Sequence, residues 1–210
     1  MSAYRTEELE AGRRLFAAEC RLLYSAQKLD QLRPAYSNEV AFAGRSTVGK
    51  SRLLNALTGH RALARVSGTP GRTRQLNFFD LGGRLTLVDM PGYGYAHADK
   101  NTKADWQALM FKFLRDRPRL RRVVLLLDSR IPVKPDDAAV MELLDRMAVT
   151  FQITLTKVDA VKSGALAAKL LEGTALVRAH SAAFPTFAVT SSVTGEGIAR
   201  LRADLAALAS

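Results

Sequence analysis

The segment from Val40 to Leu54, VAFAGRSTVGKSRLL, constrains the fold of this chain more than any other stretch. A short apolar strand leads to Gly44, and after four intervening residues Gly49-Lys50-Ser51 opens a helix. This is the G-x-x-x-x-G-K-[ST] pattern of a phosphate-binding loop, in the strand–loop–helix context that gives the motif its meaning. The segment therefore predicts a chain that binds a nucleoside triphosphate.

Each residue type in this loop suits the binding of a polyphosphate. Gly44 and Gly49 allow the backbone to wrap closely around phosphate oxygens, with free N–H groups pointing inward. The following helix presents its N-terminal amides and positive dipole end to the same oxygens. Lys50 would place its ammonium on the β and γ phosphates, and the Ser51 hydroxyl would ligate Mg²⁺. The predicted phosphate-binding residues are Gly44, Arg45, Ser46, Thr47, Val48, Gly49, Lys50 and Ser51.

Length and charge limit the kind of protein. A chain of 210 residues and 23.0 kDa suits one domain, or one domain with an extension. The net charge of +11 and pI near 10.2 are high for a small nucleotide-binding protein. A solvated basic surface explains this charge, and so does a polyanionic partner bound through salt-sensitive phosphate contacts. The aromatic signature of an RNA-binding sheet is missing, so charge alone does not name the partner, and we expect no sequence-specific DNA binding.

Several features favour a cytoplasmic protein. The longest apolar run, Val123 to Leu127, is far shorter than the ~20 residues that span a bilayer, so we expect no membrane insertion. The charged N-terminus, MSAYRTEELEAGRR, lacks the apolar segment of a signal peptide. The single cysteine, Cys20, excludes an internal disulfide and suits a reducing compartment, and its apolar neighbours predict a packed thiol. A monomer is the expected state, since the sequence predicts no coiled coil.

Hydrophobic periodicity predicts an α/β fold in which strands and helices alternate. Continuous apolar strands favour a mostly parallel sheet with helices on both faces. Gly82-Gly83 predicts a tight hairpin, which adds one antiparallel edge strand to a six-stranded sheet. An amphipathic helix over 6–26 is expected to dock on this domain, so that residues 1–36 form a helical extension and 37–210 the main domain. The other expected elements are helices over 50–57, 99–117, 135–148, 160–171 and 197–208, and strands from about 39 and over 76–81, 84–89, 122–128, 151–156 and 186–189.

A second phosphate contact is predicted at Asp89-Met90-Pro91-Gly92, which follows the strand after the hairpin. An acidic residue at the carboxyl end of a buried strand is where phosphate-loop proteins hold Mg²⁺, often through water. Gly92 leaves room for a backbone amide to approach the γ-phosphate. The D-x-x-G pattern is weak alone, and its place after a phosphate loop makes it informative.

Thr156-Lys157-Val158-Asp159 predicts the base. The Asp159 carboxylate can accept hydrogen bonds from N1–H and the exocyclic amine of guanine, whereas adenine has no proton on N1. Hydrogen bonds to charged groups contribute about 1.5–3 kcal/mol each. The stem of Lys157 can lie over the plane of the base. Thr190-Ser191-Ser192 would offer backbone amides to guanine O6. These residues predict GTP, and Asp159 argues against the alternative of a phosphate-loop ATPase or kinase.

These motifs together resemble a known family. In this order, GRSTVGKS, TPGRT, DMPGYGYA, LTKVD and TSS are similar to the EngB family of bacterial GTPases, also called YihA or YsxC. SAQKLDQLRP, NFFDL and LLLDSR are similar as well, so the resemblance runs from about residue 20 to the C-terminus. It implies a Ras-like G domain of the TRAFAC class, GTP and Mg²⁺ binding, and a role in assembly of the large ribosomal subunit. It also implies a link to cell division and septation.

By matching position, the resemblance assigns roles within the site. Asp89 to Gly92 would form the second switch, Thr156 to Asp159 the base clamp, and Thr190 to Ser192 the last guanine loop. The first switch would consist of Gly71, Arg72, Thr73, Arg74 and Gln75. Thr73 would be the second Mg²⁺ ligand beside Ser51, with Thr69 as its rival. This chain departs from the family at Thr47, usually Asn, and from the wider N-K-x-D pattern at Thr156.

Tyr93 bears on the chemistry, because many GTPases place there a Gln that orients the attacking water. Tyr93 cannot do this in the same way, so no catalytic residue is assigned, and we expect slow GTP hydrolysis without a partner or cation. The favoured function is a GTPase switch that binds the large ribosomal subunit or its assembly intermediates, through rRNA or ribosomal proteins. The alternative is a nucleotide-stabilised RNA- or ribosome-binding protein in which hydrolysis is incidental.

Overall fold

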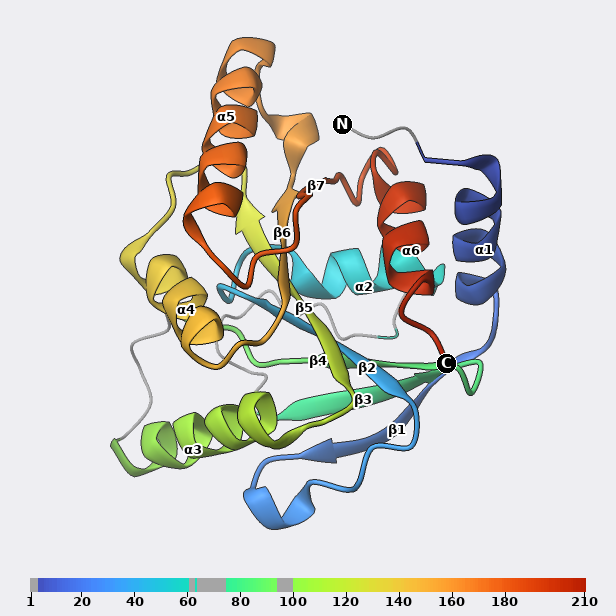
Figure 1. The fold of residues 1–210 in the computed structure, drawn as a ribbon, viewed down its shortest axis with the longest axis vertical. Helices are drawn as coiled ribbons and strands as arrows, with labels where there is room; N and C mark the ends of the chain where they lie inside the picture. The colour runs from blue at the N-terminus through green and yellow to red at the C-terminus, as the bar shows by residue number, and fades with distance from the viewer. Residues whose placement is uncertain (1–3, 61–62, 64–74, 94–99) are drawn as a thin grey trace.

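The structure is a computed structural model that describes residues 4–60, 63, 75–93 and 100–210, with the backbone alone described for 100–107. In this part of the chain, seven strands form one sheet with helices on both faces (Figure 1). The strands are β1 (Cys20–Ala26), β2 (Asn38–Gly44), β3 (Leu76–Leu81), β4 (Leu85–Asp89), β5 (Leu120–Asp128), β6 (Phe151–Thr156) and β7 (Ala188–Val189). The helices are α1 (Thr6–Phe16), α2 (Lys50–Thr58), α3 (Lys100–Asp116), α4 (Pro135–Arg146), α5 (Ser163–Ala179) and α6 (Ile198–Ala206), with 3₁₀ turns η1 (Leu29–Gln31) and η2 (Val158–Ala160).

The strand order across the sheet is β1-β3-β4-β2-β5-β6-β7. From β4 to β7 all neighbours are parallel, whereas β3 runs antiparallel to both β4 and β1. The predicted α/β class with a mostly parallel sheet is confirmed. The described sheet differs in having seven strands instead of six, and its antiparallel strand is internal because β1 forms the edge.

β1 is the strand that the sequence pattern does not predict. The expected helix over 6–26 ends at Phe16, and Cys20–Ala26 pairs with β3. The register of this pairing shifts between Leu22 and Tyr24, so Leu23 is an extra residue in a β-bulge. A bulge interrupts the alternation of the two faces of a strand. The apolar residues Cys20, Leu23 and Tyr24 therefore recur at a helix-like spacing, which is why the helix prediction is wrong here.

The predicted hairpin between β3 and β4 is confirmed. Gly82 and Gly83 have φ angles of +60° and +69°, left-handed values that favour glycine, and together with Arg84 they form the turn between the paired residues Leu81 and Leu85. The pairing of β4 with β2 then sets Asp89 beside Phe42, two residues before Gly44. The hairpin thus delivers the carboxylate of Asp89 to the edge of the sheet where the phosphate-loop motif begins.

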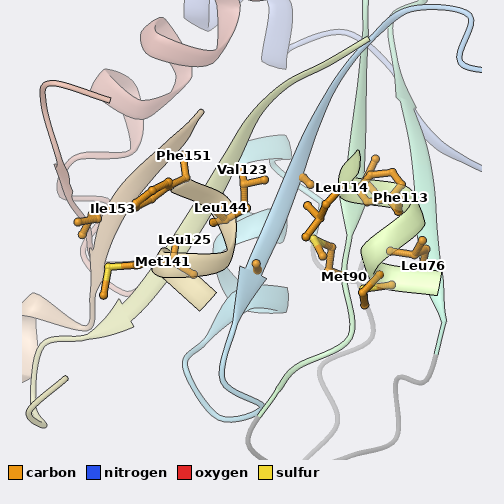
Figure 2. Close-up of a cluster of buried hydrophobic side chains, with 14 of the residues drawn as sticks. Leu76, Met90, Phe113, Leu114, Val123, Leu125, Met141, Leu144, Phe151 and Ile153 are labelled. Carbon is orange, nitrogen blue, oxygen red and sulfur yellow. The ribbon is translucent and has the colours of Figure 1, made fainter. Parts of the chain in front are cut away.

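Two buried hydrophobic clusters lie on opposite faces of the sheet, because successive side chains of a strand point to opposite sides. Val123 and Leu125 of β5 belong to one cluster, which packs α3 and α4 against the strands, and Figure 2 shows part of it. Val124 and Leu126 belong to the other, which packs α1, α2 and α6. Both faces of β5 are therefore buried beneath helices, as its continuous apolar sequence predicts.

The N-terminal helix is fixed to the rest of the fold through α6, beside which it lies in Figure 1. Gly12 permits this contact, since a Cβ there would lie only 2.6 Å from the backbone nitrogen of Ala203. Leu15 and Phe16 are buried at the end of α1. The Tyr4 hydroxyl donates a 2.8 Å hydrogen bond to Asp204 Oδ1.

α5 is longer than predicted, since it continues to Ala179 where the sequence pattern predicts an end at Leu171. The helix passes through Gly173, whose conformation is ordinary. A Cβ at Gly173 would lie 3.2 Å from the ring of Phe187. This glycine marks a close packing contact and not a helix end.

Candidate functional site

The phosphate-loop motif folds as predicted, between β2 and α2. Gly49 is the N-cap of α2 with φ +100°, a left-handed value that favours glycine. A Cβ at Gly44 would lie 2.7 Å from Val48 Cγ1, so the tight turn of the loop also requires glycine there. Lys50 and Ser51 occupy the first turn of α2, where backbone N–H groups have no partner within the helix. This arrangement suits an anion.

Lys50 and Asp89 form a buried ion pair at the base of the loop. Lys50 Nζ donates to Asp89 Oδ1, and the two residues are only 8% and 3% exposed. Asp89 reaches this position as the last residue of β4. The predicted phosphate lysine and the predicted Mg²⁺-side carboxylate are therefore brought together from separate parts of the chain.

The segment from Asp89 to Tyr93 lies directly against the loop, with Met90 and Pro91 buried. The Tyr93 N–H donates to the Gly44 carbonyl at 3.2 Å, and the Ser46 N–H donates to the Tyr93 carbonyl at 3.3 Å. A Cβ at Gly92 would lie 2.5 Å from Ser46 Cα, so the two backbones can approach only at glycine. The Ser46 amide is bonded within the protein here, which differs from the expected row of free, inward-pointing amides.

Two side chains at the end of β6 tie this strand to the loop. Thr156 Oγ1 donates to the Val48 carbonyl at 2.8 Å, and Lys157 Nζ donates to the Thr47 carbonyl at 2.7 Å. The hydroxyl of Thr156 thus reaches the loop although Thr replaces the Asn of the wider pattern. The predicted base-binding and phosphate-binding segments are neighbours in space.

Asp159 and Ser191 join the two predicted base-binding segments. The Ser191 hydroxyl donates to Asp159 Oδ1 at 2.6 Å, and the Thr190 N–H donates to the Leu155 carbonyl at 2.8 Å. Ser191 is buried, Ser192 beside it is half-buried, and Asp159 is exposed. Val158, the residue before Asp159, is buried and donates its N–H to the Thr190 carbonyl at 3.4 Å. One oxygen of Asp159 is therefore held in place on an accessible carboxylate.

The predicted first switch is mostly outside the described residues: Gly71, Arg72, Thr73 and Arg74 lie there, as does Thr69. Gln75 is described, and its side chain bonds to Asn77 at 2.9 Å and to Gln27 at 3.0 Å. Both partners belong to the β1–β3 side of the sheet. The structure thus does not bring the Gln75 side chain into contact with the phosphate loop.

The start of α4 contributes contacts that the sequence analysis missed. The Tyr93 hydroxyl donates to Asp137 Oδ1 at 2.8 Å, while Asp137 Oδ2 accepts the Lys134 N–H at 2.9 Å and so caps α4. Arg45 pairs with Asp136 at 3.6 Å. Burial, and then the neighbouring Asp137 carboxylate, raise the pKa of Tyr93. No motif marks these acidic residues, which resemble an ordinary helix start.

Asp128, at the end of β5, also joins the site and was given no role from the sequence. Its Oδ2 accepts a 2.8 Å hydrogen bond from Lys157 Nζ. Although burial raises the pKa of Asp128, hydrogen bonds from Arg130 and Lys157 outweigh it and lower the pKa to about 2. A signal was present, because the carboxyl ends of parallel strands meet at one edge of a sheet, where ligands bind.

Comparison with known proteins identifies the family of this chain. A family model described as "50S ribosome-binding GTPase" matches residues 39–157, more than half of the chain. "Probable GTP-binding protein EngB" of Granulibacter bethesdensis is 61% identical over 200 residues, which are 95% of this chain and 90% of that protein. The protein of the same name in Gluconobacter oxydans is 60% identical over 202 residues, 96% of this chain and 89% of that protein. The chain belongs to the EngB family.

EngB membership confirms the resemblance of the motifs and the enzyme class, a GTPase. Among solved structures, a probable GTP-binding protein engB superposes with a TM-score of 0.62 at 22% identity, over 81% of this chain and 97% of that one. Era of Aquifex aeolicus bound to GDP and aluminium fluoride superposes with a TM-score of 0.65 at 16% identity, over 83% of this chain and 57% of that one. These likenesses confirm the Ras-like fold. Within the described residues, no helix is long and apolar enough to cross a membrane.

Proposed function

We propose that this chain binds GTP with Mg²⁺, hydrolyses it slowly, and acts through its nucleotide state as a switch in assembly of the large ribosomal subunit. One observation carries the proposal. The Thr156 and Lys157 side chains bind the carbonyls of Val48 and Thr47, so a base site at Asp159 and a phosphate site at Lys50 lie side by side. Family membership supports the same activity.

The phosphate end of the nucleotide would occupy the loop from Gly44 to Ser51. Lys50 is held by Asp89, and the phosphate oxygens would offer its ammonium further negative charge. The first amides of α2 are available to the same oxygens. The close contact between Gly92 and Ser46 and the bond from the Ser46 amide to Tyr93 support a second switch here, since a γ-phosphate that bound the Ser46 amide would displace Tyr93.

The donor set fits Mg²⁺, which prefers oxygen ligands and usually binds proteins through one or two side chains plus substrate phosphates. The Ser51 hydroxyl and the Asp89 carboxylate are oxygen donors at the loop, and Thr73 is the proposed ligand from the first switch. No group of three or more His, Cys, Asp or Glu that could hold an ion is present in the described part of the chain. Binding of the ion would therefore depend on the nucleotide, and its chemistry is to neutralise charge on the β and γ phosphates.

The base end would lie at Asp159 with Thr190-Ser191-Ser192 beside it. Ser191 orients one carboxylate oxygen at 2.6 Å. A carboxylate fixed in this way accepts hydrogen bonds from the N–H groups of guanine and gains nothing from the bare N1 of adenine. This geometry supports specificity for GTP.

The contacts of the proposed second switch support slow hydrolysis. Asp89 is paired with Lys50, and the hydroxyl of Tyr93 is bonded to Asp137. The raised pKa of Tyr93 keeps this hydroxyl protonated, so it cannot act as a base. Both polar side chains of the described segment 89–93 therefore already have a partner within the protein. We expect turnover no faster than the intrinsic Ras-like range, on the order of 10⁻³ s⁻¹ or below, until a partner or cation completes the site.

The ribosomal role rests on the family and on the net charge of +11, which suits contacts to rRNA phosphates. We place this role in the cytoplasm, because a single cysteine suits a reducing compartment. The proposal includes the link to cell division that the family resemblance implies.

The test of the ribosomal role is co-sedimentation of the purified protein with large ribosomal subunits at several salt concentrations. Binding should be stronger with a GTP analogue than with GDP and should weaken as salt rises. Pelleting that is equal with either nucleotide would favour the alternative of a basic ribosome-binding protein in which hydrolysis is incidental.

A further inference from the structure

Lys157 is held by a carboxylate that lies outside the nucleotide motifs. Asp128 ends β5, and the register between β5 and β6 pairs it with Thr156, the residue before Lys157. The Lys157 Nζ donates to Asp128 Oδ2 at 2.8 Å and to the Thr47 carbonyl at 2.7 Å. The side chain of Asp128 is only 7% exposed. A single ammonium thus bridges the end of β5 and the phosphate loop.

The backbone of Lys157 shows that this placement is not a relaxed one. Its φ is +60°, and Ala148 is the only other non-glycine residue with positive φ in the described part of the chain. Side chains disfavour this region because Cβ crowds the following carbonyl. Such a conformation persists where surrounding contacts determine it. Here the hydrogen bonds to Asp128 and Thr47 are those contacts, and the Lys157 Cε lies 3.5 Å from where a Cβ of Gly49 would be.

Asp128 binds a second cation, which supplies a matched control. Arg130 donates to the same carboxylate through Nε at 3.0 Å and Nη2 at 2.8 Å. Its side chain is 49% exposed, whereas that of Lys157 is 24% exposed. Removal of an exposed partner of an ion pair costs little, whereas removal of one partner of a more buried pair costs more, because the other charge is left unpaired. Loss of Arg130 therefore leaves the Lys157–Asp128 contact in place.

We propose that Asp128 is a positioning residue of the nucleotide site: it holds Lys157 against the phosphate loop and so raises the affinity for guanine nucleotides without touching them. The inference rests on the proposed base site at Asp159 and extends it to a carboxylate on the neighbouring strand. Without the charge at Asp128, the ammonium of Lys157 loses its ionic partner, and the neutral Thr47 carbonyl holds it less strongly. The left-handed backbone at Lys157 then relaxes, and the β6 end separates from the loop more often.

The test is the affinity and dissociation rate of fluorescent GDP, measured by stopped-flow on the full chain. Asp128→Asn is expected to speed dissociation about tenfold, since hydrogen bonds to charged groups are the strong ones. Asp128→Glu keeps the charge and should stay within about threefold of wild type. The GDP dissociation rate of Arg130→Ala should stay within about twofold of the wild-type rate. Should Asp128→Asn fail to fold, Asp128→Ser takes its place with the same expectation.

A double-mutant cycle separates positioning from a general loss of structure. If Asp128 acts through Lys157, Asp128→Asn should change GDP dissociation less than twofold in a Lys157→Met background. An equal effect in both backgrounds, or no effect of Asp128→Asn in wild type, would overturn the proposal. Asp159→Asn is measured in parallel. If that variant binds GDP as wild type does, the base site itself is wrong, an outcome distinct from failure of the role of Asp128.

Discussion

Thr156 and Val48 are separated by 108 residues, yet the Thr156 hydroxyl donates a 2.8 Å hydrogen bond to the Val48 carbonyl. Thr156 ends β6 and is 4% exposed, and Val48 lies inside the phosphate loop and is 3% exposed. The bond is therefore shielded from water and links the residues proposed to bind the two ends of the nucleotide. It explains how Thr can stand where the wider GTPase pattern has Asn.

Thr156→Val removes this bond while keeping the side-chain volume. The Val48 carbonyl then loses a buried donor, which costs about 1–3 kcal/mol. We expect that loss in the free energy of unfolding by urea, together with GDP binding weakened about tenfold. Thr174→Val is the control, because Thr174 also donates to a backbone carbonyl, that of Leu170, but within α5. GDP affinity that falls equally in both variants would contradict a specific link between β6 and the loop.

The buried pair of Lys50 and Asp89 predicts a non-additive effect on stability. Removal of one partner of a buried ion pair costs about 3–5 kcal/mol, because the other charge is left buried and unpaired. Asp89→Asn should therefore destabilise the nucleotide-free protein more than Lys50→Met combined with Asp89→Asn does. Urea unfolding of the two single variants and the double variant tests this. Lys112→Met provides the exposed control, since Lys112 and Asp116 pair at 3.2 Å in solvent, and additive effects at positions 50 and 89 would refute the coupling.

The packing of α1 on α6 predicts that Gly12 tolerates no larger side chain. Gly12→Val would force a Cβ toward the Ala203 nitrogen, 2.6 Å away, and should cost about 1–3 kcal/mol in the free energy of unfolding. Limited proteolysis should then release the N-terminal segment. Gly164→Ala in α5 is the control, as nothing lies within 4 Å of its Cβ position. That substitution should be neutral or stabilising by up to about 1 kcal/mol, and equal tolerance at Gly12 would mean that α1 is not docked as described.

The lowered pKa of Asp128 predicts a stability change in acid. A carboxyl whose folded pKa is depressed contributes stability that is present above its unfolded pKa and lost as pH falls through the folded value. For Asp128 this window runs from its ordinary value of 3.8 down to about 2. The contribution is at most about 2 kcal/mol at neutral pH, because solvent screens part of the interaction, and Asp128→Asn should remove it. The unfolding free energies of wild type and Asp128→Asn should converge as the pH falls from about 4 to about 2. A constant difference between them across that range would contradict the lowered pKa of Asp128.

The local motifs were predictable from the sequence because each depends on residues close together in the chain. Gly44 and Gly49 are required by the turn they make, and Gly82-Gly83 by the hairpin, so the phosphate loop and the β3–β4 pair could be predicted. The burial of Cys20 also confirms the expected packed thiol.

What could not be predicted depends on tertiary contacts. The bulge at Leu23 gives β1 the spacing of a helix, and Gly173 makes its packing contact with Phe187, a residue outside its helix. Asp128 binds Lys157 from the neighbouring strand and Asp137 binds Tyr93 from α4, and the sequence analysis gave neither carboxylate a role. Such side-chain pairs become visible only when strand order is known.

The central claim is that Asp159 selects guanine at one end of a single nucleotide whose phosphates lie at Lys50. Calorimetry with GTP, ATP and xanthosine triphosphate on wild type and Asp159→Asn tests it most directly. Xanthine carries an oxygen where guanine has its amine, so the Asn amide can donate to that oxygen while its carbonyl accepts from N1–H. The account predicts that wild type binds GTP much more tightly than ATP or xanthosine triphosphate. It also predicts that Asp159→Asn loses affinity for GTP and gains affinity for xanthosine triphosphate. A variant that binds GTP as tightly as wild type would contradict it.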